Sequence, residues 1–124
     1  MKVLLTLLSI TLCACTTSTV QQRLAAGKKL SFQRDKGNCL ACHIIEQGED
    51  PGNIGPALVN MPAKYKSKQQ LKAVIWDATQ YNKQTSMPPF GRNKILSPEE
   101  LDLVVDYIWS INTPENTSPD KDTP

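Results

Sequence analysis

Apolar and polar residues recur with helical spacing in three segments of this chain, and long loops separate them. The first expected helix covers residues 18–33, because Ser18 and Gln21 have the spacing of a capping box. Val20 and Leu24 supply its apolar positions, and alanine and lysine residues continue the helical signal.

The second and third expected helices have clearer starts. Ser67 begins the second, with Gln70 at capping-box spacing. Ser97 caps the third, where Pro98 takes the first helical position and Glu100 completes the box. Their apolar faces follow the repeat of a helix; they consist of Leu71, Val74, Ile75 and Ala78 in the second and of Leu101, Val104, Val105 and Ile108 in the third.

The rest of the chain is expected to form loops. Residues 37–62 contain four glycines and three prolines, and we expect a loop there with one short turn after Cys39. Residues 81–96 form a second loop that contains proline, and the polar residues 112–124 are predicted to be a disordered tail. Because no segment alternates with a period of two, the fold class is predicted to be all-α.

The composition limits the chain to one small domain. It has 124 residues, of which 40% are hydrophobic and 21% charged, and its net charge of +2 is too small to predict nucleic-acid binding. A domain of this size buries a small share of its surface. A bound apolar cofactor would therefore add much to its stability.

Residues 1–15 have the organisation of an export signal. Lys2 precedes an apolar run over residues 3–12, which is too short to span a bilayer of about 30 Å as a helix. The alternative is a buried N-terminal helix. The end of the run, Leu12-Cys13-Ala14-Cys15, resembles a bacterial lipoprotein signal, in which the cysteine that receives the lipid follows a small residue.

This resemblance implies a mature protein that begins at Cys15 and carries lipid there. Cleavage by ordinary signal peptidase, after Ala14 or a few residues later, remains open. Either route predicts a periplasmic protein, and Thr16 after the cysteine resembles a signal for anchoring in the outer membrane. The folded domain is then expected to cover residues 16–111.

The candidate chemistry lies at Cys39-Leu40-Ala41-Cys42-His43, which has the C-x-x-C-H pattern of c-type haem attachment. Two residues between the cysteines allow a turn that presents both sulfurs to one porphyrin edge, and His43 follows as the proximal iron ligand. A zinc site would need four ligands, a thioredoxin-type dithiol would need a preceding strand, and a disulfide would leave His43 unexplained. We therefore expect one covalently attached haem c.

The second iron ligand is expected to be a methionine, because His43 is the only histidine of the chain. Met87 follows the second helix in a loop that prolines stiffen, and we predict it as this ligand. Met61 is the alternative, and it is expected to pack in the haem pocket or in the core.

The segment Gly55-Pro56-Ala57-Leu58 stands between the C-x-x-C-H motif and the second helix, and Met87-Pro88-Pro89-Phe90-Gly91 follows that helix. With these motifs in this order, the chain resembles small monohaem cytochromes c of class I. The resemblance implies about three main helices wrapped around the haem, with long loops. It also implies that the ring of His43 hydrogen-bonds to the carbonyl of Pro56. The alternative interpretation of Gly55-Pro56 is a simple turn without this role.

Two further segments narrow the resemblance to the SoxX family over about residues 20–111. They are Ile75-Trp76-Asp77-Ala78-Thr79 and the extension of the methionine loop to MPPFGR. SoxX proteins are the monohaem subunits of SoxAX, which oxidatively couples thiosulfate to a cysteine of the carrier SoxYZ. The resemblance implies a SoxA-like partner that holds the catalytic site, an L-cysteine S-thiosulfotransferase, and a downstream cytochrome acceptor. This chain would relay electrons and hold no catalytic residue.

Two alternatives belong to other classes. One is a free periplasmic electron-carrier cytochrome without an enzymatic partner, and the other is a structural lipoprotein with an incidental C-x-x-C-H motif. A permanent subunit should expose an apolar patch. Trp76 and Trp109 are candidates for that patch or for packing around the haem, and Arg92 is a candidate partner of a haem propionate.

Overall fold

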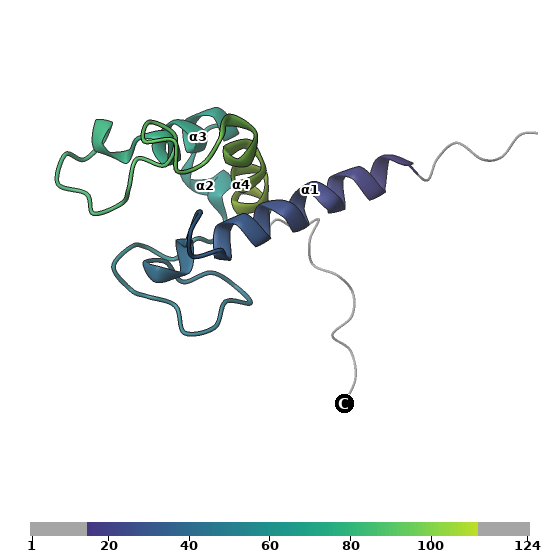
Figure 1. The fold of residues 1–124 in the computed structure, drawn as a ribbon, viewed down its shortest axis with the longest axis horizontal. Coiled ribbons are helices and arrows are strands. Elements are labelled where there is room, and N and C mark those ends of the chain that lie inside the picture. The colour runs from purple at the N-terminus through teal and green to yellow at the C-terminus, as the bar shows by residue number, and fades with distance from the viewer. Residues whose placement is uncertain (1–14, 112–124) are drawn as a thin grey trace, which may run out of the picture.

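The computed structural model describes residues 15–111, and the structural statements below concern this part of the chain. It contains helices and turns but no strand, so the predicted all-α class is confirmed (Figure 1). The elements are α1 (Cys15–Phe32), α2 (Met61–Lys64), α3 (Lys68–Trp76) and α4 (Pro98–Ser110), with 3₁₀ turns at Cys39–Ala41 and Ala78–Gln80.

The predicted signal peptide and the predicted tail of residues 112–124 lie outside the described residues, except for Cys15, at which α1 begins. The export of the chain and the lipid on Cys15 therefore stay predictions. Within residues 15–111, no helix is both long enough and apolar enough to cross a membrane.

The prediction that the first helix begins at Ser18 is wrong, because α1 already begins at Cys15. A serine caps a helix only where its own backbone lies outside the helix, with extended dihedral angles. Thr16 and Thr17 are helical, so the backbone has no break at Ser18. The end of α1 at Phe32 agrees with the expected limit near residue 33.

The predicted starts of α3 and α4 are confirmed. The hydroxyl of Ser67 accepts a hydrogen bond from the backbone N–H of Gln70 (3.2 Å). At α4 both halves of the capping box are present: Ser97 Oγ accepts from the N–H of Glu100 (3.2 Å), and Glu100 Oε2 accepts from the N–H of Ser97 (2.9 Å). Orphan donors at both helix starts are thereby satisfied.

Neither α2 nor the turn at Ala78–Gln80 follows from the sequence pattern. The glycines and prolines of residues 37–62 predict a loop, but Pro62 stands in the first turn of α2, where a proline costs no hydrogen bond. The helix buries Met61, whose side chain is 2% exposed within the hydrophobic core. This placement agrees with the expectation that Met61 packs in the core.

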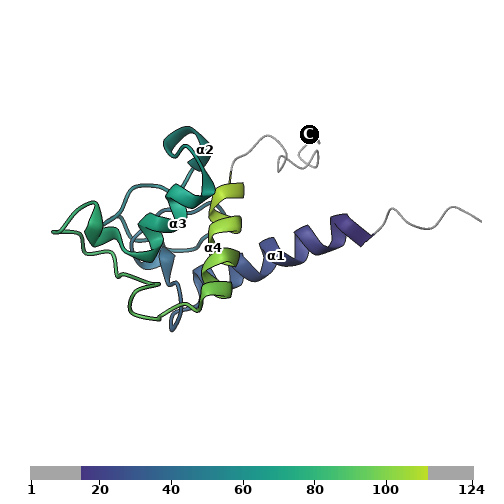
Figure 2. The ribbon, with the colours of Figure 1, turned by 90° about the horizontal axis from the view of Figure 1, so that it is seen from above.

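Two helices cross closely at Gly27. A Cβ atom at this position would lie 2.0 Å from the carbonyl oxygen of Leu103 in α4, so only glycine allows this approach. One turn further along, the rings of Phe32 and Tyr107 meet edge to face, with centroids 6.1 Å apart and planes at 82°. Figures 1 and 2 show α1 crossing α4 there, while its N-terminal half extends beyond the other helices.

The core is built around α4, which packs against α1 on one side and α3 on the other (Figure 2). All four residues of its predicted apolar stripe are buried, as are Leu71 and Ile75 of α3. The remaining buried apolar residues come mostly from loops and from α2. They are Ile45, Met61, Ala78, Phe90, Leu96 and Ile111.

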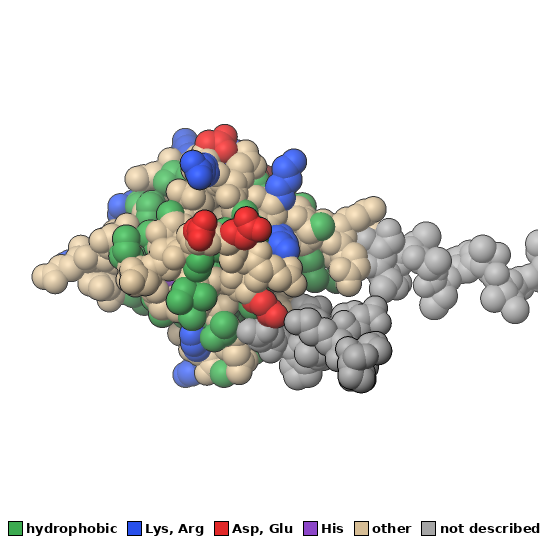
Figure 3. Space-filling view, turned by 90° about the horizontal axis from the view of Figure 1, so that it is seen from below, with side chains coloured by type: hydrophobic (Ala, Val, Ile, Leu, Met, Phe, Trp, Pro, Cys, Tyr) green, Lys and Arg blue, Asp and Glu red, His purple; other side chains and the backbone are tan. Residues whose placement is uncertain are grey.

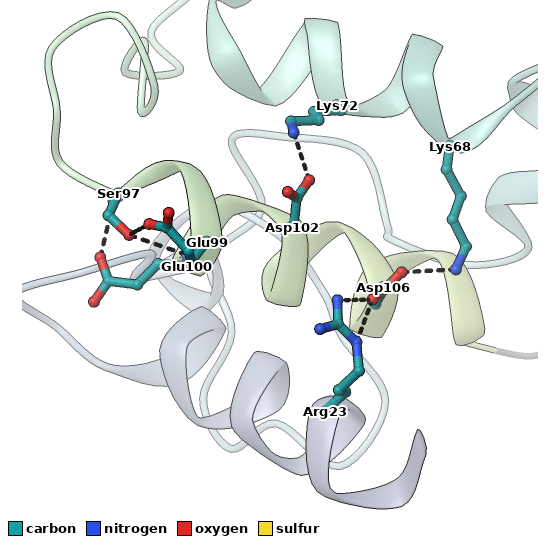
Figure 4. A network of polar contacts seen from close by, with 8 residues as sticks. All are labelled: Arg23, Lys68, Lys72, Ser97, Glu99, Glu100, Asp102 and Asp106. Carbon is teal, nitrogen blue, oxygen red and sulfur yellow. Dashed lines mark hydrogen bonds and ion pairs between the residues drawn. The ribbon is translucent and has the colours of Figure 1, made fainter. Parts of the chain in front are cut away.

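Charged side chains connect the same three helices at the surface (Figure 4). The carboxylate of Asp106 in α4 accepts hydrogen bonds from Arg23 of α1 (2.6 Å) and Lys68 of α3 (2.7 Å), and Lys72 pairs with Asp102. Burial raises the pKa of Asp106, but the hydrogen bonds from Lys68 and Arg23 outweigh it and leave the pKa below its ordinary value. Single exposed pairs contribute about 0–1 kcal/mol each.

Candidate haem site

The two long loops, which carry the candidate ligands, lie on the side of the helices opposite the N-terminal half of α1 (Figures 1 and 2). One loop contains Cys39, Cys42 and His43, and the other contains Met87. Hydrophobic side chains gather on the half of the surface over these loops in Figure 3, with charged side chains dispersed around them.

The C-x-x-C-H motif forms one tight turn directly after α1. Asn38 adopts a left-handed conformation (φ 46°, ψ 36°) that turns the chain into the 3₁₀ turn Cys39–Ala41. The N–H of His43 then donates to the carbonyl of Cys39 (2.9 Å). Neither cysteine is in a disulfide, so both thiols are available for thioether bonds.

The loop with the motif is attached to the start of α4. Lys36 Nζ lies 2.8 Å from Glu100 Oε1 and donates a hydrogen bond to Glu100 Oε2 (3.0 Å). The hydrogen bond from Lys36 is the largest cause that lowers the pKa of Glu100, followed by the hydrogen bond from the N–H of Ser97. Glu100 thus caps α4 and fixes the approach to the cysteines at once.

The imidazole of His43 is held by the residues that the resemblance implies. Its Nδ1 lies 2.7 Å from the carbonyl oxygen of Pro56. A carbonyl can only accept, so Nδ1 carries the proton and Nε2 has a lone pair left for a metal. Gly55 allows this contact, because a Cβ there would lie 2.3 Å from Cε1 of the ring.

Main-chain hydrogen bonds hold residues 52–58 beside residues 40–44. The N–H groups of Gly52, Gly55 and Leu58 donate to the carbonyls of Leu40, Cys42 and Ile44, at 2.7, 2.8 and 2.9 Å. The segment that orients the imidazole is therefore paired directly with the segment that carries the ligand. This restricts the position of His43 before any metal binds.

The environment of Cys39 differs from that of a redox dithiol. Burial raises the pKa of the Cys39 thiol to about 11, against the smaller opposite effect of the Ser31 hydroxyl. The reactive cysteine of a thioredoxin-type motif instead has a lowered pKa. Cys39 is a partly buried thiol with a raised pKa, which fits a covalent attachment point rather than thiol exchange.

Met87 and Met61 occupy different environments. The side chain of Met87 is half-buried and packs against the edge of the core, and its N–H donates to the hydroxyl of Thr85 (3.2 Å). Met61 is enclosed by the core in α2. Met87 is thus the candidate methionine that the core does not enclose, and its role as iron ligand stays a prediction.

The residues present fit a covalently bound haem. The donor set consists of two free thiols, an imidazole with Nε2 available and a thioether on a second loop. Partly buried apolar side chains, including Leu40, Leu58, Tyr65 and Trp109, line the edge of the core and can cover an apolar ring. Among residues 15–111, no group of three or more His, Cys, Asp or Glu side chains could hold a metal ion.

Asp77 has a structural role that the sequence pattern does not indicate, although it lies in the segment Ile75-Trp76-Asp77-Ala78-Thr79 that carries part of the resemblance. Its carboxylate is 1% exposed and lies 2.9 Å from Nη1 of Arg92. A carboxylate directly after the apolar face of a short helix was the only available signal. Trp76, one of the two tryptophans left open, packs its indole against Gly91 and is 43% exposed.

The cytochrome c family model matches residues 24–112, so the chain belongs to the cytochrome c family and its cofactor is a covalently bound haem c. The fold is similar to that of a chain in the crystal structure of SoxXA from P. pantotrophus. The TM-score is 0.62 and the sequence identity 24%, over 69% of this chain and 79% of that one. No curated protein matches the chain in sequence.

Proposed function

We propose that this chain is the electron-relaying subunit of a SoxAX-type complex that couples thiosulfate to a carrier cysteine. The observation that carries the proposal is the similarity in fold to SoxXA over more than two thirds of the chain. The segments around Trp76 and Met87, which resemble those of SoxX proteins, support it independently.

The chemistry of the coupling explains why such a subunit is needed. The sulfur of the carrier thiol bonds to the terminal sulfur of thiosulfate, the thiol proton leaves, and an electron pair must be removed. When bound, haem c supplies reversible one-electron chemistry. The residues of this chain attach the group through two thioethers, orient His43 through Pro56 and offer a thioether on the opposite loop.

The bond-forming site is expected on a SoxA-like partner. The only imidazole of this chain is committed, with Nδ1 bonded to Pro56 and Nε2 directed to iron in this proposal. Two other groups with shifted pKa values have structural roles: the ion pairs hold the pKa of Asp106 below its ordinary value, and burial raises the pKa of Tyr107 in the helix crossing to about 12. None of these groups forms a pair of nucleophile and base.

Exposed apolar side chains near the loops support the presence of a protein partner. Ile44 and Ile54 flank the His43 segment and are 49% and 71% exposed, and Tyr81 at the other loop is 61% exposed. We propose the SoxA-like subunit as a stable partner, and SoxYZ and a downstream cytochrome as partners of the complex. The location would be the periplasm, with a lipid on Cys15 anchoring the chain to the outer membrane.

Affinity purification of the tagged full chain from its native organism tests the proposal. We expect a second c-type cytochrome to co-purify, and the purified complex to become reduced when thiosulfate and the carrier are added together. With the variant Cys39→Ala/Cys42→Ala, which should yield little folded protein, we expect no second cytochrome to co-purify. A haem-loaded chain that purifies alone and is inert to thiosulfate would instead indicate a free electron carrier.

A further inference from the structure

The loop that carries Met87 is closed at its base by Asp77 and Arg92. Asp77 directly follows α3, and Arg92 stands fifteen residues further along the chain. Nη1 of Arg92 lies 2.9 Å from Oδ2 of Asp77, and the N–H groups of Gly91 and Arg92 both donate to the carbonyl of Trp76 (3.1 and 3.2 Å). The two ends of the loop are therefore held together by side chains and backbone.

The carboxylate of Asp77 organises this closure from a buried position. Oδ1 accepts hydrogen bonds from the N–H (3.1 Å) and the hydroxyl (2.5 Å) of Thr79, and Oδ2 accepts one from Gln80 Nε2 (3.3 Å). The Thr79 hydroxyl is the main cause that lowers the pKa of Asp77. Arg92 Nη1 also lies 3.4 Å from the Thr79 hydroxyl, so Arg92, Thr79 and Asp77 form one connected cluster.

This cluster bears on Met87 because a thioether is a neutral ligand whose bond to iron competes with water and with other small ligands. The bond is favoured when the loop is already closed in the unliganded state, since little conformational entropy is then lost. Within the loop, the N–H of Met87 donates to Thr85 Oγ1, which orders the backbone next to the sulfur. The closure at Asp77 acts over the whole loop.

We propose that Asp77 is a positioning residue for the distal ligand: paired with Arg92, it holds the loop of residues 77–92 closed and keeps the thioether of Met87 on the haem iron. The proposal rests on Met87 as the axial ligand, which is part of the proposed function. It assigns the control of how readily the distal position opens to an ion pair between a buried carboxylate and an exposed guanidinium.

The test measures opening of the distal position in the haem-loaded protein. Imidazole binds ferric iron only when the methionine has left, so its apparent affinity reports the open fraction. We expect Asp77→Asn to increase that affinity about tenfold, as when a closed state loses one charge-assisted contact. The absorption band of the methionine–iron bond should weaken and the reduction potential should fall.

Asp102→Asn is the matched control. It removes the same charge from an ion pair, with Lys72, that lies between α3 and α4 and away from the loop. Its imidazole affinity and potential should equal those of the wild type. Arg92→Gln removes the other partner of the ion pair and should raise the imidazole affinity as Asp77→Asn does. It keeps the test possible if Asp77→Asn folds poorly. Arg92→Lys retains the positive charge, so its imidazole affinity should lie between those of the wild type and Arg92→Gln.

Three outcomes would contradict the positioning role of Asp77. Unchanged imidazole affinity, band and potential in both Asp77→Asn and Arg92→Gln would overturn the proposal. A loss of thermal stability in these variants without a change in imidazole affinity would also overturn it, because the cluster would then be structural only. If Met87→Ala retains the methionine–iron band, the ligand assignment fails and the proposal fails with it. That result is distinct from the first two.

Discussion

Replacing Gly27 with alanine tests how much of the stability depends on the close crossing of α1 and α4. The new Cβ would lie 2.0 Å from the carbonyl oxygen of Leu103 and 2.8 Å from Cβ of Tyr107. The Leu103 carbonyl belongs to the backbone of α4 and cannot rotate away. The helices must therefore separate by roughly 1 Å or more, which loosens the packing on both sides of the contact.

Two effects of opposite sign determine the size of the change. Alanine inside a helix is more favourable than glycine by about 0.5–1 kcal/mol. Overpacking costs about 1–3 kcal/mol, and contact with a backbone atom places Gly27→Ala in the upper part of that range. We expect a net loss of about 1–2 kcal/mol in the free energy of unfolding. Each kcal/mol lowers Tm by about 4–8 °C in a domain of this size.

Thermal unfolding of the haem-loaded protein, followed by far-UV circular dichroism, measures this loss. Ala25→Gly is the matched control, because Ala25 is exposed on the same helix and its change reports helix propensity alone. The control should lose about 0.5–1 kcal/mol. A Tm of Gly27→Ala at or above the wild-type value would refute the reasoning, since the helices could then separate at no cost.

Further predictions concern the capping box, the methionine in the core, an ion pair and the haem attachment. Ser97→Ala removes the cap of α4 and should cost about 1 kcal/mol in thermal unfolding. Met61→Leu preserves volume, so it should cost less than about 1.5 kcal/mol and leave the methionine–iron band unchanged. Because the folded pKa of Asp106 is depressed, the stability difference between wild type and Asp106→Asn should be present above pH 3.8 and disappear as the pH falls below it, in acid-unfolding curves. The variant Cys39→Ala/Cys42→Ala should yield little folded protein and no haemochrome spectrum; normal yields of folded, haem-free chain would contradict this.

The helix start at Ser97 shows what could be predicted from the sequence. Ser97 and Glu100 bond to each other's backbone, so both hydrogen bonds of the capping box are made between residues three apart in the sequence. The same spacing predicts a helix start at Ser18 that is wrong, because the residues before Ser18 are already helical. The C-x-x-C-H turn is equally local, and its residues lie together as the spacing indicates.

Gly27 and Asp77 show what could not be predicted. The role of Gly27 depends on Leu103, and the role of Asp77 depends on Arg92, so each becomes visible only when distant segments are placed in space. A single sequence carries no signal for these pairs. A glycine within a helix lowers helix propensity, and an aspartate after a helix is an ordinary surface residue in most proteins.

The backbone pairing of residues 52–58 with residues 40–44 makes the orientation of His43 independent of the side chains that the segment 52–58 presents to solvent. Its three hydrogen bonds involve only main-chain atoms, and the bond to the imidazole is also made by a main-chain carbonyl. Asn53 and Ile54, which lie in the same segment, are exposed to solvent. Related chains can therefore diverge at these two positions to suit different redox partners, while the orientation of His43 stays constant.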